Sequence, residues 1–405
     1  MSNLKSGIDP SLFDTKVRPQ DDLYVYSNGA WLSTHQIPAD RSNSGITYEL
    51  FLQAEAQVKA IIEEDKGKIG RLFNSFMNTA KIEADGINPI KDDLAQADKI
   101  IDAKSLISTI AELEIYGGPG IFGAYIYPDV GNTKQYAIYI YQGGLSLPDE
   151  AYYREEQYAP IREAFLDHVK KMSEIAGIAI DAAALLKLET EIASFHWDQV
   201  KDRDAIATYN KMSFSELKAL SPNLDWDTYL SAGQIAPEKF SEIVVREPSF
   251  FEGISKILGN FDVEAWRNWL RWHILSGSAG YLNEALVNQN FAFYAATLSG
   301  TPKIRERWKR GISFVEGALG EEIGKVYVKR HFPESSKQKM EVLVQNLIKA
   351  YEISIKELDW MTEETKVKAL EKLSKFNTKI GYPDKWRDYS ALEIVDDLHT
   401  NLANI

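Results

Sequence analysis

The 405-residue chain contains no cysteine, and this absence removes several kinds of chemistry at once. A disulfide, a thiolate nucleophile and a zinc site with sulfur ligands are all excluded. Long apolar stretches are also missing, because no run approaches about eighteen uninterrupted apolar residues. Residues 1–10 lack the apolar segment of a secretion signal. We therefore expect a cytoplasmic protein with no membrane partner.

Clustered basic residues are scarce, which argues against a nucleic-acid partner. The 59 acidic residues outnumber the 46 Lys and Arg residues, and the formal net charge is −13. Phosphate binding depends on grouped Lys and Arg side chains, whereas the basic runs here, such as residues 305–310, are short. The excess of negative charge is typical of a surface that favours solubility.

Histidines are too dispersed to form the zinc motif HExxH. In that motif two imidazoles four residues apart on a helix bind the metal, and the glutamate acts as a general base. The six histidines are His35, His168, His196, His273, His331 and His399, and none is followed by the required glutamate. GxSxG, a P-loop and a GxGxxG after a strand are also absent. The sequence therefore predicts no catalytic and no metal-binding residues in this chain.

Two of these histidines have simple structural interpretations. His196 follows an expected helix, where its ring can hydrogen-bond a nearby carbonyl group. His273 lies among Trp266, Trp269 and Trp272, so we expect it to pack in the core or at its rim. Neither histidine is predicted to bind a metal.

The distribution of apolar residues predicts a mainly α fold, a large multi-helix lobe. Apolar side chains recur every three or four positions over residues 46–116, as in Ala54, Val58, Ile61 and Ile62. Further helices are predicted within 151–200, where we expect two, and over 213–220, 225–232, 237–244, 262–276, 281–298, 303–319, 335–357 and 362–376.

One small β-hairpin interrupts the helical pattern. The Gly-Gly-Pro-Gly cluster at 117–120 is followed by two segments rich in aromatic and β-branched residues, 121–127 and 136–141. Turn chemistry between them comes from residues 131–132, Gly-Asn. Before the first helix, residues 10–45 are polar, aromatic and interrupted by proline. We expect this N-terminal segment to be an extended strap with one short helical turn.

Signals at two later helix ends are also informative. Thr362 is a good N-cap, because Glu363 and Glu364 then fall in the first turn, where the helix dipole favours negative charge. Residues 392–405 are predicted to form a helix with one apolar face and no terminating Gly or Pro. An apolar face without a stop signal suggests either an interface with a partner or a cut in a longer helix.

Several ordered motifs carry a family resemblance. Residues 26–31 read Tyr-Ser-Asn-Gly-Ala-Trp, residues 142–153 read Gln-Gly-Gly-Leu-Ser-Leu-Pro-Asp-Glu-Ala-Tyr-Tyr, and residues 380–386 read Ile-Gly-Tyr-Pro-Asp-Lys-Trp. In this order and at this separation they resemble the N-terminal half of the neprilysin and endothelin-converting-enzyme family of zinc metallopeptidases. The resemblance covers nearly the whole chain.

The resemblance implies two helical lobes around a closed cavity that admits only small peptides. It places the zinc ligands, the general-base glutamate and the substrate-binding strand downstream of residues 380–384, outside this chain. By this resemblance residues 1–45 are a strap that packs on the missing catalytic lobe, 46–386 are the substrate-sequestering lobe, and 387–405 begin the connection to the catalytic lobe.

The expected function is therefore the N-terminal, substrate-enclosing part of a zinc metalloendopeptidase that cleaves small peptides and is not catalytic alone. A complementary zinc-bearing half would be its partner, with zinc bound there and no cofactor in this chain. Two alternatives remain open. One is a non-catalytic helical binding protein, and the other is a truncated remnant of such a peptidase.

Three residues are candidates for the substrate chamber. Arg203 and Asp204 precede a turn that contains Asn210, and the resemblance includes all three. A structural role is the alternative, since a buried ion pair or a helix cap at this place would tie two helices together. The sequence alone favours the structural role.

Overall fold

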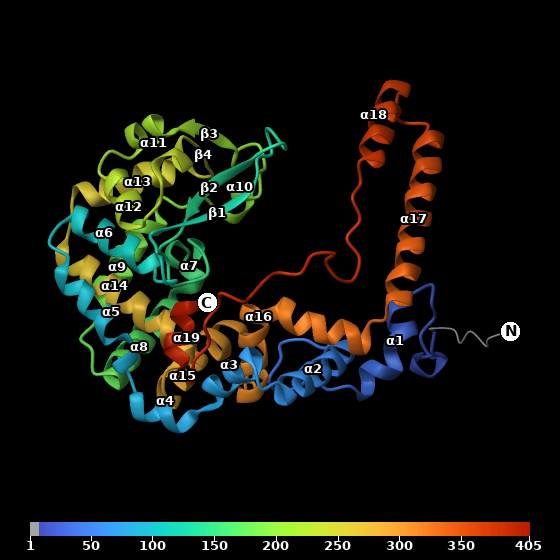
Figure 1. Ribbon diagram of the computed structural model, residues 1–405, viewed down its shortest axis with the longest axis horizontal. Coiled ribbons are helices and arrows are strands. Elements are labelled where there is room, and N and C mark those ends of the chain that lie inside the picture. The colour runs from blue at the N-terminus through green and yellow to red at the C-terminus, as the bar shows by residue number, and fades with distance from the viewer. Residues whose placement is uncertain (1–7) are drawn as a thin grey trace.

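The computed structural model describes residues 8–405, which form an open arc (Figure 1). A large helical body lies on one side of the arc, a base of packed helices runs along the bottom, and a two-helix arm rises on the other side. The expected mainly α fold is confirmed. Within residues 8–405 no helix combines the length and apolar character that crossing a membrane requires.

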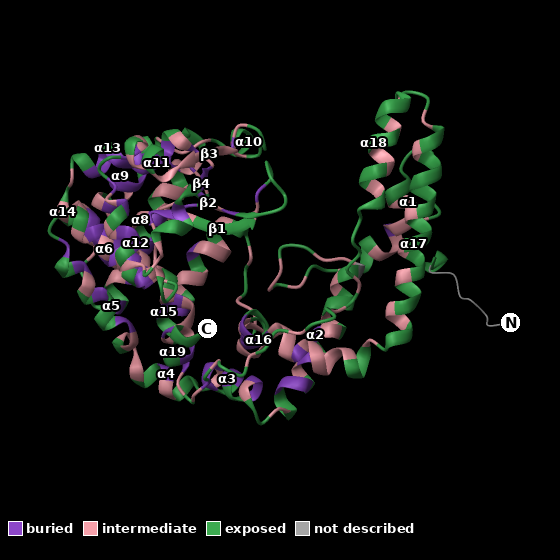
Figure 2. Ribbon diagram, turned by 45° about the horizontal axis from the view of Figure 1, so that its top comes forward, coloured by how far each residue is buried: buried purple, intermediate pink, exposed green. Residues whose placement is uncertain are grey.

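The body consists of short and medium helices around the largest hydrophobic core. Trp266, Trp269 and Trp272 lie on one face of α14 and are at most 1% exposed, so they form the centre of this core. Buried residues concentrate accordingly in the body (Figure 2). Its helices are α5 Lys91–Gln96, α6 Ala103–Glu114, α7 Ala151–Arg154, α8 Ala159–Ala176, α9 Ala182–Ala193, α10 Gln199–Asp202, α11 Phe214–Leu220, α12 Trp226–Ala232, α13 Pro248–Gly259, α14 Val263–Ser278 and α15 Glu284–Phe291, the last continued by a π-helix over Ala292–Thr297.

A four-stranded sheet is built into the body. The predicted hairpin is present as β1 Phe122–Pro128 and β2 Tyr136–Gln142, which pair antiparallel. Two further strands, β3 Asn210–Ser213 and β4 Glu242–Val245, extend it in the order β1-β2-β4-β3. Strand β4 runs parallel to β2 and antiparallel to β3. The hairpin is therefore the outer half of a mixed sheet.

The helix predicted over residues 237–244 is wrong. A 3-10 turn, Pro237–Phe240, is followed directly by strand β4. Ile243, Val244 and Val245 are each 0% exposed. A short run of β-branched residues buried on both faces fits a strand in the middle of a sheet better than an amphipathic helix. Periodicity alone cannot distinguish these two cases in so short a segment.

The base of the arc brings together helices from both ends of the chain. A second core cluster joins α2, α3 and α16, and includes Ile62, Leu72 and Leu319 at no more than 1% exposed. The helix α16 is kinked at Leu319, where φ is −122° and ψ is 27°. The helices of the base are α2 Ile46–Glu64, α3 Lys68–Met77, α4 Thr79–Asp85, α16 Arg307–His331 and α19 Leu398–Asn404.

The N-terminal segment is more helical than the expected extended strap. After a short 3-10 turn, Pro10–Leu12, it forms α1, Leu23–Thr34. The Asp22 side chain caps this helix by accepting a hydrogen bond from Val25 N at 2.8 Å. Residues 28–29, Asn-Gly, lie inside α1. Gly29 is needed there, because a Cβ atom would lie only 2.5 Å from the Cβ of Asp14.

The C-terminal segment packs on the base. The prediction of a helix over 392–405 with an apolar face for a partner is wrong. The helix comprises only α19, Leu398–Asn404. Ile394 and Leu398 are each 3% exposed. Ile394 packs in the core shared by α2, α3 and α16, and Leu398 packs beside Phe76 and Ile82. The apolar face of this segment is thus covered within the chain.

The arm lacks a core of its own. It consists of α17, Glu334–Glu357, and α18, Glu363–Ser374, and neither helix contains a buried residue. Thr362 caps α18 as predicted, accepting a hydrogen bond from Thr365 N at 3.3 Å. Both helices of the arm project away from the base (Figure 1).

Replacing Asn401 tests how the C-terminal segment is held. Asn401 is 0% exposed, exchanges hydrogen bonds with the backbone of Val395 and donates to Ser75 Oγ at 3.0 Å. Asn401→Ala should lower the free energy of unfolding in urea by about 2–3 kcal/mol, because it leaves buried polar groups without their hydrogen-bond partners. Asn404→Ala, an exposed neighbour, is the control and should change it by less than about 0.5 kcal/mol. Equal effects of the two variants would contradict this packing.

Candidate functional site

A cavity of about 580 Å³ lies beside the hairpin on one face of the sheet. Its walls come from the loop at 142–150, from residues within 196–202 and from residues 246–247 at the end of β4. Tyr125 and Tyr141 of the hairpin line the remaining side. The volume is within the range of roughly 300–1,000 Å³ that is usual for ligand pockets.

The loop at 142–150 is fixed by one buried carboxylate, that of Glu189 on α9. Glu189 is 0% exposed, and its Oε2 accepts a hydrogen bond from the Tyr153 hydroxyl at 2.5 Å. Its Oε1 accepts from the Ser146 hydroxyl at 2.6 Å and lies 2.9 Å from Nε2 of His273. A buried carboxylate is tolerated when its oxygens are paired and hydrogen-bonded in this way.

Tyr153 connects the loop to that carboxylate. Its hydroxyl oxygen accepts hydrogen bonds from Leu147 N at 2.9 Å and Ser146 N at 3.1 Å, while its proton goes to Glu189. Burial and the nearby charge of Glu189 raise the pKa of Tyr153 well above its usual range. The phenol therefore stays protonated and remains a donor at every physiological pH.

Two tryptophans of the core also hold the loop. Trp272 Nε1 donates to Ser146 Oγ at 2.8 Å, and Trp269 Nε1 donates to the Gly144 carbonyl at 3.0 Å. The His273 ring lies against the Trp269 ring, with ring centroids 4.2 Å apart. This contact confirms the expected packing of His273 among the tryptophans. The position of the loop is therefore determined by the centre of the body.

His196 lines the cavity and has the structural role expected for it. Its Nε2 lies 2.9 Å from the Gly143 carbonyl. Burial lowers the pKa of His196 to about 4, so the ring is neutral near pH 7 and Nε2–H donates to that carbonyl. Arg154 Nη2 also donates to the His196 carbonyl at 2.8 Å.

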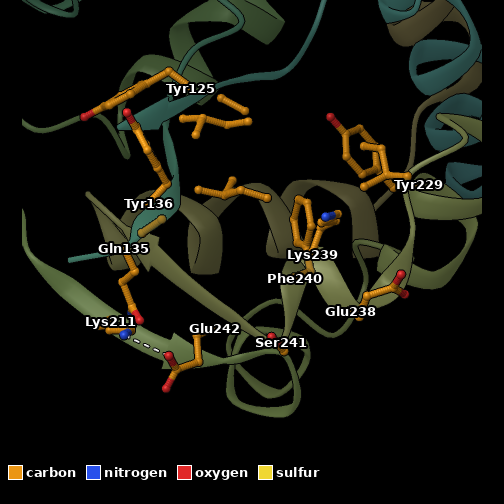
Figure 3. Close-up of a pocket in the computed structure, with 15 residues that line it drawn as sticks. Tyr125, Gln135, Tyr136, Lys211, Tyr229, Glu238, Lys239, Phe240, Ser241 and Glu242 are labelled. Carbon is orange, nitrogen blue, oxygen red and sulfur yellow. Dashed lines mark ion pairs between the residues drawn. The ribbon is translucent and has the colours of Figure 1, made fainter. Parts of the chain in front are cut away.

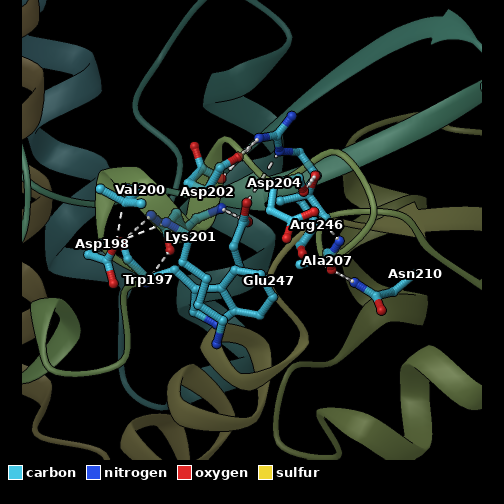
Figure 4. A network of polar contacts seen from close by, with 12 residues as sticks. Trp197, Asp198, Val200, Lys201, Asp202, Asp204, Ala207, Asn210, Arg246 and Glu247 are labelled. Carbon is cyan, nitrogen blue, oxygen red and sulfur yellow. Dashed lines mark hydrogen bonds and ion pairs between the residues drawn. The ribbon is translucent and has the colours of Figure 1, made fainter. Parts of the chain in front are cut away.

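A hydrogen-bonded group of three ionisable residues, Asp202, Arg246 and Glu247, lies on the β4 side of the cavity (Figure 4). Arg246 Nη2 lies 2.9 Å from Oδ1 of Asp202, and Arg246 Nε lies 3.2 Å from Oε1 of Glu247. Arg246 Nη1 also donates to the Tyr125 hydroxyl at 3.2 Å. Oε2 of Glu247 accepts from Gln142 N at 2.8 Å, which ties β4 to the start of the loop.

The two carboxyl groups of this cluster have opposite shifts in pKa. Glu247 is 0% exposed, and its burial, with the adjacent Asp202, raises its pKa to about 8. Burial acts in the same direction on Asp202, but hydrogen bonds from Glu247 and Arg246 outweigh it and lower the pKa of Asp202. Near pH 7 the pair therefore holds one proton, on Glu247, which donates it toward the ionised Asp202.

The three predicted chamber residues lie next to this cluster but do not line the cavity. Arg203 and Asp204 are exposed, and Asp204 Oδ1 accepts hydrogen bonds from the amides of Ile206 and Ala207 at 2.8 and 3.0 Å (Figure 4). Asn210 Nδ2 donates to the Ala207 carbonyl at 2.7 Å. Their contact with a substrate stays a prediction. The cavity itself is lined by their neighbours.

Sequence reasoning did not identify the residues that organise the cavity: Glu189, Asp202, Arg246 and Glu247. Glu189 left one signal, because it is an acidic residue beside the apolar positions Leu188 and Ile192 of its helix. An acidic residue on a buried helix face needs a specific partner. That partner, His273, is 84 residues away in the sequence, and no local pattern points to it.

Arg41 lies outside the cavity and has one buried donor without a hydrogen-bond partner in the described part of the chain. Its guanidinium lies 5.0 Å from the ring centre of Tyr48 and 5.3 Å from that of Phe51, and its Nε donates to the Tyr48 hydroxyl at 3.3 Å. Its Nη2 is buried and has no hydrogen-bond partner among residues 8–405.

A metal centre is not assembled by the part of the chain that the structure describes. No group of three or more His, Asp or Glu side chains lies together there in a way that could hold a metal ion. The expectation that zinc is bound by another part of the protein stays a prediction.

The fold and the site together define a large helical domain with a preformed cavity beside a small sheet. Residues 19–383 match peptidase family M13, and the chain belongs to this family. Among the curated relatives, it is 29% identical to a neutral endopeptidase of Lactobacillus helveticus over 92% of this chain and 60% of the relative. It is 24% identical to human endothelin-converting enzyme 1 over 100% of this chain and 55% of the relative.

Solved structures agree with this assignment. The chain superimposes on the Mycobacterium tuberculosis zinc metalloprotease Zmp1 in complex with an inhibitor with a TM-score of 0.93 at 40% identity, covering 98% of this chain and 63% of Zmp1. The TM-score with Zmp1 in an open state is 0.82. The chain thus spans about 55–63% of the length of these relatives.

Tyr153→Phe tests the anchoring of the loop. Removing the hydroxyl leaves Glu189 with one donor fewer and leaves the amide of Leu147 without its acceptor, so the free energy of unfolding should fall by about 2–3 kcal/mol. Urea denaturation measures it. Tyr152→Phe, at the half-exposed neighbouring ring, is the control and should have little effect. If Tyr153→Phe lowers the free energy of unfolding as little as Tyr152→Phe does, the loop is held by other contacts.

Glu247→Gln tests the shared proton. Between about pH 4.5 and 8, Glu247 is protonated in the folded chain and ionised in the unfolded chain. The unfolded state therefore binds fewer protons than the folded state, and the free energy of unfolding falls as the pH rises. The wild type should therefore lose stability relative to Glu247→Gln over that interval, measured as the difference in melting temperature from pH 5 to 8.5. The exposed Glu252→Gln is the control. A pH-independent difference for Glu247→Gln would contradict the raised pKa.

Proposed function

We propose that this chain is the N-terminal, substrate-enclosing part of a zinc metalloendopeptidase that acts on small peptides. It works with a zinc-bearing part, which is either joined to it or supplied as a separate chain, and it is not catalytic alone. Zinc and the general base for hydrolysis belong to that other part, so no step of the chemistry is assigned to residues of this chain.

The arm provides the observation that carries this proposal. Met340, Leu343, Leu347 and Tyr351 repeat at the three- and four-residue spacing of one helix face along α17 and are 42–63% exposed. A contiguous apolar stripe of this kind marks an interaction surface. The covering surface is not provided by residues 8–405, since α17 has no buried residue. The stripe fits a second lobe that packs against the arm.

The comparisons support the same assignment. The part of Zmp1 that this chain does not match is 37% of that protein, enough for a second lobe.

Binding of peptides is supported by one feature of the site. The cavity beside the hairpin is rigidly walled by the loop that Glu189 holds, so it exists before any ligand arrives.

We also propose that the protein is cytoplasmic, as the sequence suggests. Fractionation of the source cells, followed by detection with an antibody to the chain, tests this location. Recovery in the soluble cytoplasmic fraction is the expected result, and recovery outside the cell or in the membrane fraction would contradict it.

Complementation tests the proposed function. The purified chain should be mixed with the C-terminal part of Zmp1 that this chain does not match, as the zinc-bearing half, and with a quenched fluorescent peptide. Cleavage should appear only in the mixture and should stop when a chelator removes zinc. Cleavage no faster than that by the second half alone would contradict the proposal and favour a non-catalytic binding protein.

Leu347→Glu tests the interface on the arm. The side chain is 51% exposed, so the melting temperature of the chain alone should hardly change. Its charge would be buried on assembly, and the affinity for the second half should fall at least about tenfold, measured by calorimetry. Gln345→Glu, an exposed position of α17 off the apolar stripe, is the matched control and should bind normally. Equal binding by both variants would place the interface elsewhere.

A further inference from the structure

Strand β1 leaves one edge of the sheet open. The carbonyl group of Ile140 on β2 accepts a hydrogen bond from Arg246 N, on the β4 side. Backbone groups alternate in direction along a strand, so the N–H and C=O groups of the even-numbered residues of β2 point towards β4 and away from β1. By the pairing register, Ala124 lies opposite Ile140 and Ile126 opposite Ile138. Ala124 and Ile126 therefore direct their N–H and C=O groups to the outer side of the sheet.

These outward groups have no partner among residues 8–405, because no hydrogen bond from β1 to another segment on that side is present there. The strand also lacks the devices that usually protect an edge. Residues 122–127 read Phe-Gly-Ala-Tyr-Ile-Tyr, with no charge and no proline before Pro128. An uncharged open edge is a template for pairing with another extended chain.

A second cavity lies against one face of the same strand (Figure 3). Ala124 and Ile126 are among the residues that line it. Its volume is about 730 Å³, and its apolar lining includes Ala124, Ile126, Ile138, Ile235 and Phe240. Charged side chains also line it: Lys211 Nζ lies 2.8 Å from Oε2 of Glu242, and Glu238 and Lys239 lie on another side of the cavity (Figure 3). The cavity can hold apolar side chains of a strand added beside β1.

The opposite face of the hairpin is aromatic. Tyr125 stacks on Tyr139 with ring centres 5.0 Å apart, and Tyr127 and Tyr141 lie beside them at 5.8–6.5 Å. An added strand would therefore meet an apolar cavity on one face and tyrosine rings on the other. Alternating side chains of an extended peptide suit such a pair of surfaces.

We propose that β1 is a strand-addition site for an extended peptide, whose backbone pairs with Ala124 and Ile126 and whose alternate apolar side chains enter the cavity of about 730 Å³. This inference rests on the proposed function, since it names how the N-terminal part holds peptides. The site differs from the cavity beside the loop at 142–150, with which it shares only Tyr125.

Peptides with selectively methylated amides test the backbone pairing. The probe is a fluorescein-labelled peptide, acetyl-Lys-Leu-Thr-Leu-Thr-Leu-Lys-amide, titrated with the intact 405-residue chain and followed by anisotropy. In an added strand only every second amide faces β1. N-methylation of one alternating set, either Leu or Thr, should therefore abolish binding, while methylation of the other set leaves it. Equal effects of the two sets, or no saturable binding, would overturn the proposal.

Ile126→Pro tests the same contact from the protein side. Proline removes only the outward N–H of Ile126 and leaves the pairing of β1 with β2, so the hairpin should survive. The dissociation constant of the probe should rise about five- to tenfold. Ile126→Val retains the amide and should bind within about twofold. Circular dichroism checks that both variants fold. An Ile126→Pro variant that folds and binds as the wild type would contradict the assignment.

The remaining outcomes separate this inference from the proposed function. Peptide binding is measured on this chain alone, whereas hydrolysis requires the second half. Hydrolysis in the complementation mixture without any binding at β1 would overturn the strand-addition site and leave the proposed function intact. Dimerisation of the chain that Ile126→Pro abolishes, without peptide binding, would assign the open edge to a second copy and overturn the proposal.

Discussion

The buried carboxylate of Glu189 is the contact on which the site depends. It joins α9 to α14 through His273 and to the loop at 142–150 through Tyr153 and Ser146. A carboxylate without exposure must have all of these partners in place, so the loop cannot move without a large energetic cost. The wall of the cavity is therefore determined by the core of the body, and the shape of the cavity does not depend on a ligand.

Most of the fold follows from local signals in the sequence. The periodicity of apolar residues predicts the helices of the body, base and arm, and Thr362 caps α18 as its sequence context requires. The errors have a common cause. Strand β4 is a short buried run whose pairing with β2 is long-range, and α1 depends on the close approach of Gly29 to Asp14. Neither contact leaves a local pattern in the sequence.

The site was less predictable than the fold. Motif reasoning led to residues 203–210, and the structure places the charged cluster of Asp202, Arg246 and Glu247 immediately beside them. The missed residues act through partners distant in sequence, as Asp202 and Arg246 do. The family motif at 142–153 has a physical explanation, since its final residue, Tyr153, binds two amides of the loop. Residues 142–145 and 147–150 of the motif line the cavity.

We propose that the loop at 142–150 is a preformed wall and that another part of the protein covers the arm. Hydrogen exchange of the chain, alone and with a zinc-bearing half, tests this claim most directly. Alone, the amides of Ser146 and Leu147 should exchange as slowly as those of α14, while α17 exchanges fast and becomes protected only when the second half is added. Rapid exchange at Ser146 and Leu147 in the isolated chain, or no added protection of α17, would contradict the account.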